Sequence, residues 1–227
     1  MSTMEKLKQR FIELMVECEA LKFGEFKLKS GRIAPWFFNL GSIYNGKNIS
    51  KLGDLYAEAI KEKFGEEFDV VFGPAYKGIP LALSIVISLS KNYGIDKGYS
   101  FDRKEVKEHG DKGIIVGHPI ADGTRIILVD DVMTTGKTKD DVIALLNSIA
   151  KVKFVGLVIG VDRQEVDDEG KVAVEEFEKK YKIPVKPIIT LKDIIEVLYN
   201  KKVNGRVYID DNIKQKLDEY VEKYGAK

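Results

Sequence analysis

The stretch at residues 126–149 constrains the fold most, because an apolar run passes there into two acidic residues and then into a helical pattern. The run Ile126 to Val129 is mostly β-branched, which predicts a strand buried on both faces, as in a parallel sheet. From Asp141 onward apolar residues recur at helical spacing. The loop therefore opens a helix, and its N–H groups face the positive end of the helix dipole, where a phosphate is readily held.

Two adjacent carboxylates, Asp130 and Asp131, end the predicted strand, and hydroxyls, a glycine and a lysine follow at 134–138. This order suggests a ligand that carries both hydroxyls and a phosphate. The acid pair alone is also compatible with a strand terminus followed by a turn. The Gly-Lys-Thr sequence is similar to a nucleoside-triphosphatase P-loop, but that motif needs a glycine where Asp131 stands, which argues against it.

Length and composition narrow the class of protein. A chain of 227 residues with 44% apolar content can bury one good core with a modest elaboration. No apolar run reaches the length of a bilayer span, and the N-terminal residues are amphipathic rather than a secretion signal, so no membrane association is expected. With 37 basic and 36 acidic residues, no global field attracts nucleic acid. The single cysteine, Cys18, is expected in the core and fits a cytoplasmic protein.

The remaining apolar patterns alternate between helix and strand periods. Helices are predicted at 4–21, 49–64, from 79, from 141, at 172–181, from 191 and over 200–227, and strands at 70–72, near 101, at 126–129, 153–161 and 184–189. This alternation predicts an α/β fold with a doubly wound, mainly parallel sheet flanked by helices. A small hood is expected from about residues 1–48 together with C-terminal segments.

Four other segments have polar or aromatic residues in unusual places. Residues 23–39 predict a strand, a turn at Ser30-Gly31 and a returning aromatic strand, which is either a packed hairpin or the wall of a site. Residues 70–79 predict a strand, a glycine loop and a helix, which is either an ordinary turn or a ligand loop. Residues 102–117 are a solvated charged loop or a basic lid, and 162–165 are a charged strand end or an anion contact.

In this order, the segments LKSGRIAPWFFN, GPAYKGIP, FDRKEVKEHG, VDDVMTTGKT and DRQE resemble the motifs of orotate phosphoribosyltransferases, which have the type I phosphoribosyltransferase fold. The resemblance covers residues 23 to about 199 and implies one phosphoribosyltransferase domain over 1–227. It also implies that the peptide bond before Tyr76 can be a non-proline cis bond. Two positions depart from the family pattern: Trp36 replaces a tyrosine, and Lys137 stands where a hydroxyl is typical. Lys137 either tightens phosphate binding or has a surface role.

The resemblance assigns most of these residues to substrates. It implies binding of phosphoribosyl pyrophosphate (PRPP) by Lys29, Tyr76, Lys77, Arg103, Lys104, Lys107, His109, Asp130, Asp131, Val132, Met133, Thr134, Thr135, Gly136, Lys137 and Thr138. It implies binding of orotate by Phe37, Phe38, Thr134 and Arg163. The implied catalytic residues are Lys29, Arg103, Lys107, Asp130 and Asp131.

The implied reaction transfers ribose 5-phosphate from PRPP to orotate, giving orotidine 5′-monophosphate and pyrophosphate in the biosynthesis of UMP. Mg²⁺ is expected as the cofactor, held mainly by PRPP and water and not directly by the protein. A homodimer is expected, in which the basic loop at 102–117 closes over the neighbouring subunit's site.

Two other functions compete with this one. A purine or uracil salvage phosphoribosyltransferase shares the central loop, but it should lack the LKSGR segment and the arginine of DRQE. A non-catalytic regulator that binds nucleic acid should have a basic face or an added winged-helix domain, and neither is evident in the sequence.

Overall fold

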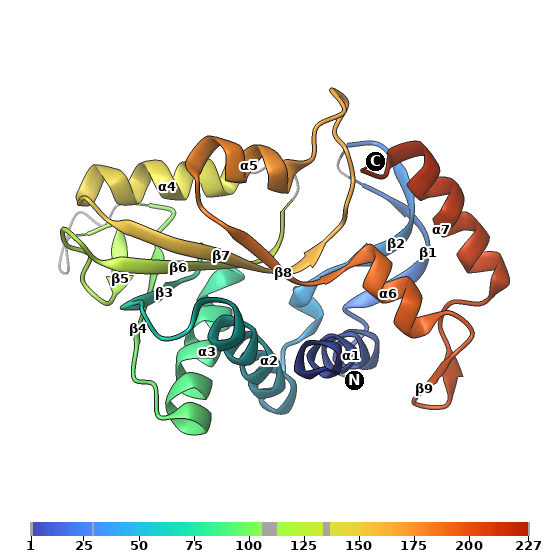
Figure 1. Ribbon diagram of the computed structural model, residues 1–227, viewed down its shortest axis with the longest axis horizontal. Coiled ribbons are helices and arrows are strands. Elements are labelled where there is room, and N and C mark those ends of the chain that lie inside the picture. The colour runs from blue at the N-terminus through green and yellow to red at the C-terminus, as the bar shows by residue number, and fades with distance from the viewer. Residues whose placement is uncertain (1, 29, 106–112, 134–136, 227) are drawn as a thin grey trace.

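A six-stranded sheet lies between two layers of helices in the computed structural model, which describes residues 2–28, 30–105, 113–133 and 137–226 (Figure 1). The strands are β3 (Val70–Phe72), β4 (Gly98–Asp102), β5 (Ile115–Gly117), β6 (Arg125–Val132), β7 (Lys153–Asp162) and β8 (Val185–Thr190). Their order is β5-β4-β3-β6-β7-β8, and every neighbouring pair is parallel except β4 with β5. The predicted doubly wound, mainly parallel sheet is therefore confirmed.

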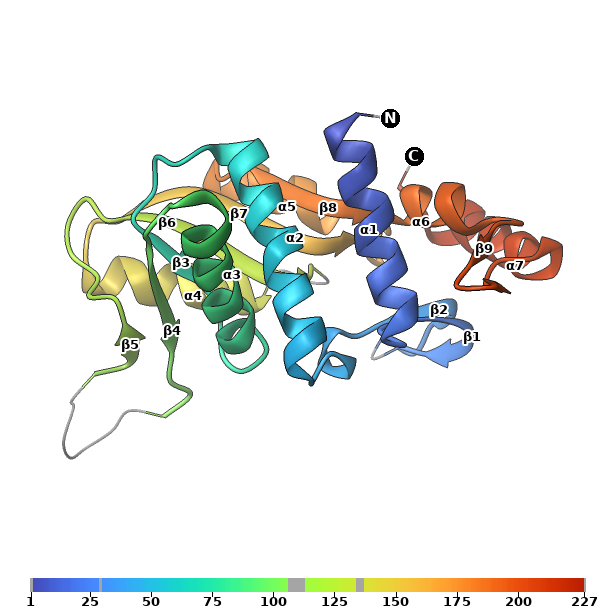
Figure 2. The ribbon, with the colours of Figure 1, turned by 90° about the horizontal axis from the view of Figure 1, so that it is seen from below.

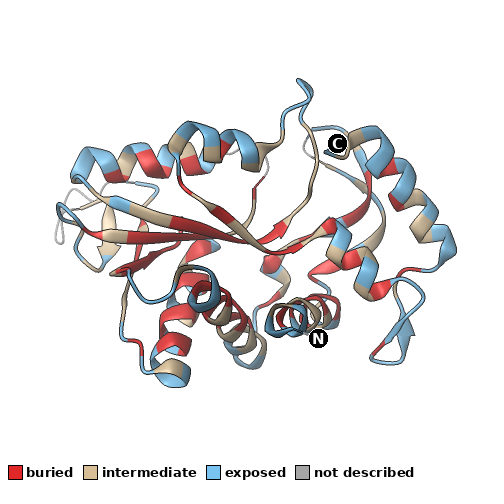
Figure 3. Cartoon of the chain, in the orientation of Figure 1, coloured by how far each residue is buried: buried red, intermediate tan, exposed pale blue. Residues whose placement is uncertain are grey.

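The two helical layers bury both faces of the central strand. The helices are α1 (Thr3–Glu17), α2 (Gly46–Phe64), α3 (Gly78–Tyr93), α4 (Lys137–Ile149), α5 (Ala173–Tyr181), α6 (Leu191–Leu198) and α7 (Asp211–Tyr224). Helices α1, α2 and α3 lie side by side on one face, and α4 and α5 cover the other (Figures 1 and 2). Because strand side chains alternate, Ile127 and Val129 of β6 join the core beneath α1, α2 and α3, whereas Ile126 and Leu128 join the core beneath α4 and α5. The middle of the sheet is accordingly buried (Figure 3).

A second unit of structure combines the β1–β2 hairpin with the C-terminal helix. Strand β1 (Leu21–Lys27) pairs antiparallel with β2 (Ile33–Phe38), and a 3₁₀ turn (Leu40–Ser42) follows. Helix α7 packs against β2, so the hairpin and the C-terminal helix lie together beside the sheet (Figure 1). The segment after β7 joins them, because Arg32 Nη1 donates to Val166 O at 2.7 Å and Val166 N donates to Tyr224 O at 2.9 Å.

Several predicted boundaries were wrong, each for a local reason. The first helix ends at Glu17 rather than residue 21, because Glu19 takes a positive φ of 52° and Leu21 already pairs with Phe38 in the hairpin. Cys18 is the C-cap and is only partly buried, although it packs against the core. The helix predicted over 200–227 begins only at Asp211, because a short hairpin of β9 (Lys202–Val203) and β10 (Arg206–Val207) precedes it.

The boundaries of β6 and α4 also differ from the predicted ones. Strand β6 continues through the two acids to Val132, because Asp130 pairs with Ile159 of β7 and Val132 with Val161. Helix α4 begins at Lys137, four residues before the predicted start at Asp141.

The sheet topology brings three loops to one edge. Parallel strands β3, β6 and β7 are adjacent, so the segments after Phe72, Val132 and Asp162 leave from the same side of the sheet. The chain reverses its winding direction between β3 and β6, because β4 lies on one side of β3 and β6 on the other. In open α/β sheets this switch point is where ligands bind.

Helices α2 and α3 pack closely because α2 has a glycine at their contact. A Cβ atom on Gly53 would lie 2.6 Å from the backbone oxygen of Ser84 in α3, closer than real side chains come. This close packing matters for the site, since α2 carries Tyr56 and α3 begins directly after Lys77.

We predict that Gly53→Ala lowers the free energy of unfolding by about 1–3 kcal/mol despite alanine's better helix propensity, because the added methyl group pushes the two helices apart. Urea denaturation measures the change. Gly46→Ala is the matched control in the same helix, since a Cβ there has no neighbour within 4 Å. Equal stability of both variants would contradict the close-packing argument.

Candidate active site

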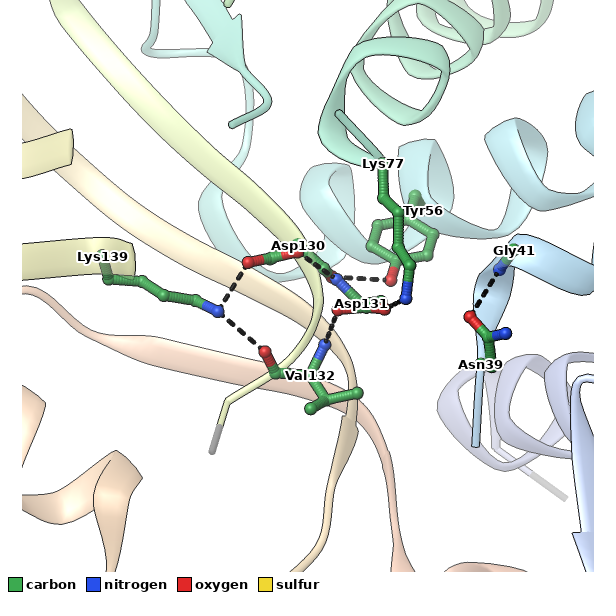
Figure 4. A network of polar contacts seen from close by, with 8 residues as sticks. All are labelled: Asn39, Gly41, Tyr56, Lys77, Asp130, Asp131, Val132 and Lys139. Atoms are coloured by element: carbon green, nitrogen blue, oxygen red, sulfur yellow. Dashed lines mark hydrogen bonds and ion pairs between the residues drawn. The ribbon is translucent and has the colours of Figure 1, made fainter. Parts of the chain in front are cut away.

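The two acids at the end of β6 form the centre of the site. Asp130 Oδ1 accepts a hydrogen bond from the backbone N–H of Asp131 at 2.8 Å, and Asp131 Oδ1 accepts one from Val132 at 2.8 Å (Figure 4). Both side chains are largely covered, with 14% and 15% of their surface exposed. Each carboxylate therefore has one oxygen fixed by the backbone and one left for another partner.

Two lysines from different elements occupy those remaining oxygens. Lys77, just before α3, places its Nζ 2.9 Å from Asp131 Oδ2. Lys139, in the first turn of α4, places its Nζ 2.5 Å from Asp130 Oδ2 and donates to the carbonyl oxygen of Val132 at 2.8 Å. Figure 4 shows the two lysines approaching the acid pair from opposite sides. They differ in environment, because the Lys77 side chain is 53% exposed and that of Lys139 only 8%.

A buried phenol donates a hydrogen bond to the backbone of the acid pair. Tyr56 of α2 is fully buried, and its hydroxyl donates to the carbonyl oxygen of Asp130 at 2.9 Å. Burial raises the pKa of Tyr56 well above its usual value, and the charges of Asp131 and Asp130 add to the effect, so the phenol remains a donor. Burial also raises the pKa of Asp130, with Lys139 opposing and Asp131 reinforcing the shift.

The loop after β3 presents Tyr76 and Lys77 at the switch point. Its peptide bond between Ala75 and Tyr76 is cis, as the sequence resemblance had suggested. Gly73 and Gly78 close the loop, because a Cβ on Gly73 would lie 2.0 Å from the Gly78 carbonyl oxygen. The exposed side chain of Tyr76, at 72%, is therefore carried by a tightly closed turn.

Asp102, at the end of β4, connects this turn with the basic segment that follows. It is buried, accepts from Ala75 N at 2.8 Å through Oδ1, and lies 3.3 Å from Lys104 Nζ through Oδ2. Arg103 donates from Nη1 to Gly113 O at 3.1 Å, across the base of the segment. The predicted site residues Lys107 and His109 lie outside the described residues, as does Lys29.

The arginine after β7 is held on an aromatic platform. Arg163 Nη2 lies 2.6 Å from Glu165 Oε1, and the guanidinium carbon is 4.1 Å from the ring centroid of Trp36. Trp36 is fully buried in β2, so the residue that departs from the family pattern lies beneath the predicted orotate arginine. Burial and the charge of Glu165 raise the pKa of the neighbouring Tyr220 to about 12, which keeps this phenol neutral.

The two phenylalanines predicted at the orotate site lie on opposite faces of β2. Phe37 is 37% exposed and stacks with Phe26, with ring centroids 5.5 Å apart, whereas Phe38 is buried. A strand alternates its side chains, so only one of the two rings faces any given pocket. Their roles in binding stay predictions.

The central loop is described only at its ends. Val132 is partly buried, Met133 is buried and Thr138 is exposed. Lys137 is the first residue of α4. Thr134, Thr135 and Gly136 lie outside the described residues.

Three residues that support the site were not predicted from the sequence. Lys139, Asp102 and Tyr56 act on the site through tertiary contacts, and each has an ordinary residue type for its element. The available indication was charge placement, since Lys139 stands three residues before Val142, on the apolar face of α4, and Asp102 directly precedes two basic residues.

Neither a metal cage nor a membrane span occurs in the part of the chain that the structure describes. Within it, no three His, Cys, Asp or Glu side chains are grouped so that they could hold a metal ion. No helix there is long and apolar enough to cross a bilayer. The acids that are present, Asp130 and Asp131, are engaged by lysines, an arrangement that suits a ligand which brings its own anionic oxygens.

The acid pair lies at the switch point of a doubly wound sheet, and residues 39–187 match the "Phosphoribosyl transferase domain" family, which places the chain among the phosphoribosyltransferases. Orotate phosphoribosyltransferases from Clostridium botulinum Alaska E43 and Lachnoclostridium phytofermentans are each 46% identical to it. These matches cover 99% and 98% of this chain and 100% and 99% of those relatives. The chain belongs to the orotate phosphoribosyltransferase family.

A solved structure agrees with this assignment. The crystal structure of orotate phosphoribosyltransferase from Francisella tularensis superposes with a TM-score of 0.80 at 37% identity. The superposition covers 95% of this chain and 98% of that one. The similarity therefore includes the hairpin and C-terminal helix as well as the sheet.

Proposed function

We propose that the protein transfers ribose 5-phosphate from PRPP to N1 of orotate, forming orotidine 5′-monophosphate and pyrophosphate in pyrimidine biosynthesis. The observation that carries the proposal is the contact between Lys77 and Asp131 at the switch point, 2.9 Å apart. It brings a cation suited to a diphosphate next to a carboxylate suited to ribose hydroxyls. The family membership of the whole chain supports the same reaction.

The charges of the site match the charge changes of the reaction. Departure of pyrophosphate leaves positive charge on the ribose ring and negative charge on the diphosphate, as in other glycosyl transfers. Asp130 and Asp131 would bind the ribose hydroxyls and favour the cationic ring, while Lys77, Arg103 and Lys104 would stabilise the diphosphate. The 5′-phosphate would be held by residues 134–138, at the start of α4.

The exposed lysine has two partners in this scheme. Lys77 pairs with Asp131, and its largely exposed side chain could turn to the diphosphate when PRPP enters. That exchange would free Asp131 for the ribose. Mg²⁺ would be held by PRPP oxygens and water, and when bound it would supply further positive charge to the diphosphate.

Orotate would bind beside the hairpin. A guanidinium matches a planar carboxylate with two parallel hydrogen bonds, and Arg163 is already oriented by Trp36 and Glu165. The partly exposed ring of Phe37 would contact the pyrimidine. Orotate can react as its anion, so no general base is required.

We also propose a cytoplasmic homodimer in which the basic loop of one subunit closes over the site of the other. Exposed apolar side chains on α3 support an interface there, because Leu83 and Ile87 are 39% and 44% exposed. They lie on the helix that begins beside Lys77, so a partner on this face would be close to the site.

Loss of orotate absorbance on mixing the protein with PRPP and Mg²⁺ tests the reaction directly. We expect orotate to be consumed and orotidine 5′-monophosphate to appear, with uracil and hypoxanthine left unchanged as control bases. Turnover of a control base in place of orotate would overturn the substrate assignment.

Replacement of the predicted orotate arginine tests how the base is selected. We expect Arg163→Lys to lower kcat/KM for orotate roughly 10- to 100-fold, because one ammonium cannot replace a two-point contact, while the KM for PRPP stays unchanged. Steady-state kinetics with each substrate varied measure both. Arg206→Lys is the matched control, since Arg206 also stacks on an aromatic ring, that of Tyr208, but on the distant β9–β10 hairpin. A loss confined to the KM for PRPP would refute the assignment.

The dimer proposal predicts that Ile87→Glu produces monomers with reduced activity, because a charge would enter the apolar contact. Light scattering after size-exclusion chromatography gives the mass. Ile149→Glu, at an equally exposed position (42%) on α4, should remain dimeric. A wild-type mass equal to one chain would rule the dimer out.

A further inference from the structure

Lys139 is the most deeply buried lysine that takes part in an ion pair in the described part of the chain. Its side chain is 8% exposed, and lysine is almost never buried unless it is paired. It lies in the first turn of α4, yet its Nζ reaches back to β6, on the other side of the central loop. The family motif assigns it no role, because the phosphate loop ends at Thr138.

Its two partners tie the ends of the loop together. The ammonium lies 2.5 Å from Asp130 Oδ2 and donates to Val132 O at 2.8 Å, so a single side chain joins the helix start to the strand end. Asp130 Oδ1 is already fixed by the N–H of Asp131. Both oxygens of Asp130 are therefore held from within the protein.

The second carboxylate has a different countercharge. Asp131 pairs with Lys77, which is 53% exposed and can leave for a ligand, whereas Lys139 is enclosed with Asp130. A further polar group beside Asp130 is the phenol of Tyr56, which donates to its backbone oxygen and not to its carboxylate. Lys139 is thus the cation that sets the charge and position of the Asp130 carboxylate.

We propose that Lys139 is a positioning residue for PRPP, which acts by holding the Asp130 carboxylate ionised and aimed at the ribose while it fixes the strand end to the first turn of α4. The inference rests on the proposed function and deepens it. It makes the two acids unequal: Asp130 has a permanent internal countercharge, and Asp131 has an exchangeable one.

A double-mutant cycle separates this role from direct contact with the phosphate. PRPP is titrated with Mg²⁺ into the wild type, Lys139→Met, Asp130→Asn and the double variant by calorimetry, and kcat and KM are measured for each. We expect Lys139→Met to weaken PRPP binding about tenfold or more, because a buried carboxylate loses its cation. We expect kcat to fall less than the affinity does. In the Asp130→Asn background the same substitution should have a much smaller effect, because the carboxylate is already gone and only the bond to Val132 O is lost.

The control is an ion pair between α4 and α5. Asp140 follows Lys139 and pairs with Lys180 of α5 at 3.0 Å, with the two side chains 40% and 56% exposed. Lys180→Met should leave PRPP affinity unchanged. Circular dichroism and thermal melts show which variants fold. If Lys139→Met does not fold, the comparison of Asp130→Asn with the double variant still decides, since neither leaves a buried carboxylate without a cation.

Two results would overturn the proposal: a Lys139→Met affinity like that of the wild type, or a folded double variant that binds PRPP much more weakly than Asp130→Asn. The second would mean that Lys139 acts on PRPP by a route other than the Asp130 carboxylate. Orotate turnover is scored separately. A wild type that binds PRPP and shows the coupling but does not consume orotate would refute the proposed reaction and leave the role of Lys139 intact. A wild type that binds no PRPP would refute both the proposed reaction and the role of Lys139.

Discussion

The need to neutralise two adjacent carboxylates at the end of a buried strand governs the structure around the site. Strand β6 is buried on both faces, and Asp130 and Asp131 at its end are largely shielded from water. A buried charge without a partner is strongly destabilising. The fold supplies one lysine to each acid, from the helix starts of α3 and α4, and a phenol from α2 beneath them. The close packing of α2 on α3 fixes the relative positions of Tyr56 and Lys77.

The same arrangement explains why the site is stable without substrate and still able to accept it. Each acid has one oxygen bonded to backbone, which fixes its rotamer, so the lysines compete only for the second oxygen. An ion pair with an exposed lysine contributes little to stability, and breaking it is cheap. In the proposed reaction, a ribose hydroxyl would therefore replace Lys77 at Asp131 without disturbing the sheet.

The sequence predicted the parts of this protein that depend on local pattern. The strands flanking the site and the helices after them follow from apolar periodicity, and the strand, glycine loop and helix at 70–79 indicated either a ligand loop or an ordinary turn after that strand. Contacts between distant residues were not predictable in this way. The Lys139–Asp130 pair, the bond from Ala75 to Asp102 and the stacking of Arg163 on Trp36 depend on tertiary packing. The β9–β10 hairpin was missed because two-residue strands have no period to detect.

The segment that follows Arg163 is fastened at two points to parts of the chain that are far away in sequence. Arg32, in the turn of the N-terminal hairpin, holds Val166 and Asp168, and the last residues of the chain bond to the backbone at Gln164 and Val166. A displacement of the hairpin would therefore also displace Arg163, unless these bonds broke first. Arg163, the predicted orotate contact, is thus mechanically coupled to the hairpin and to α7.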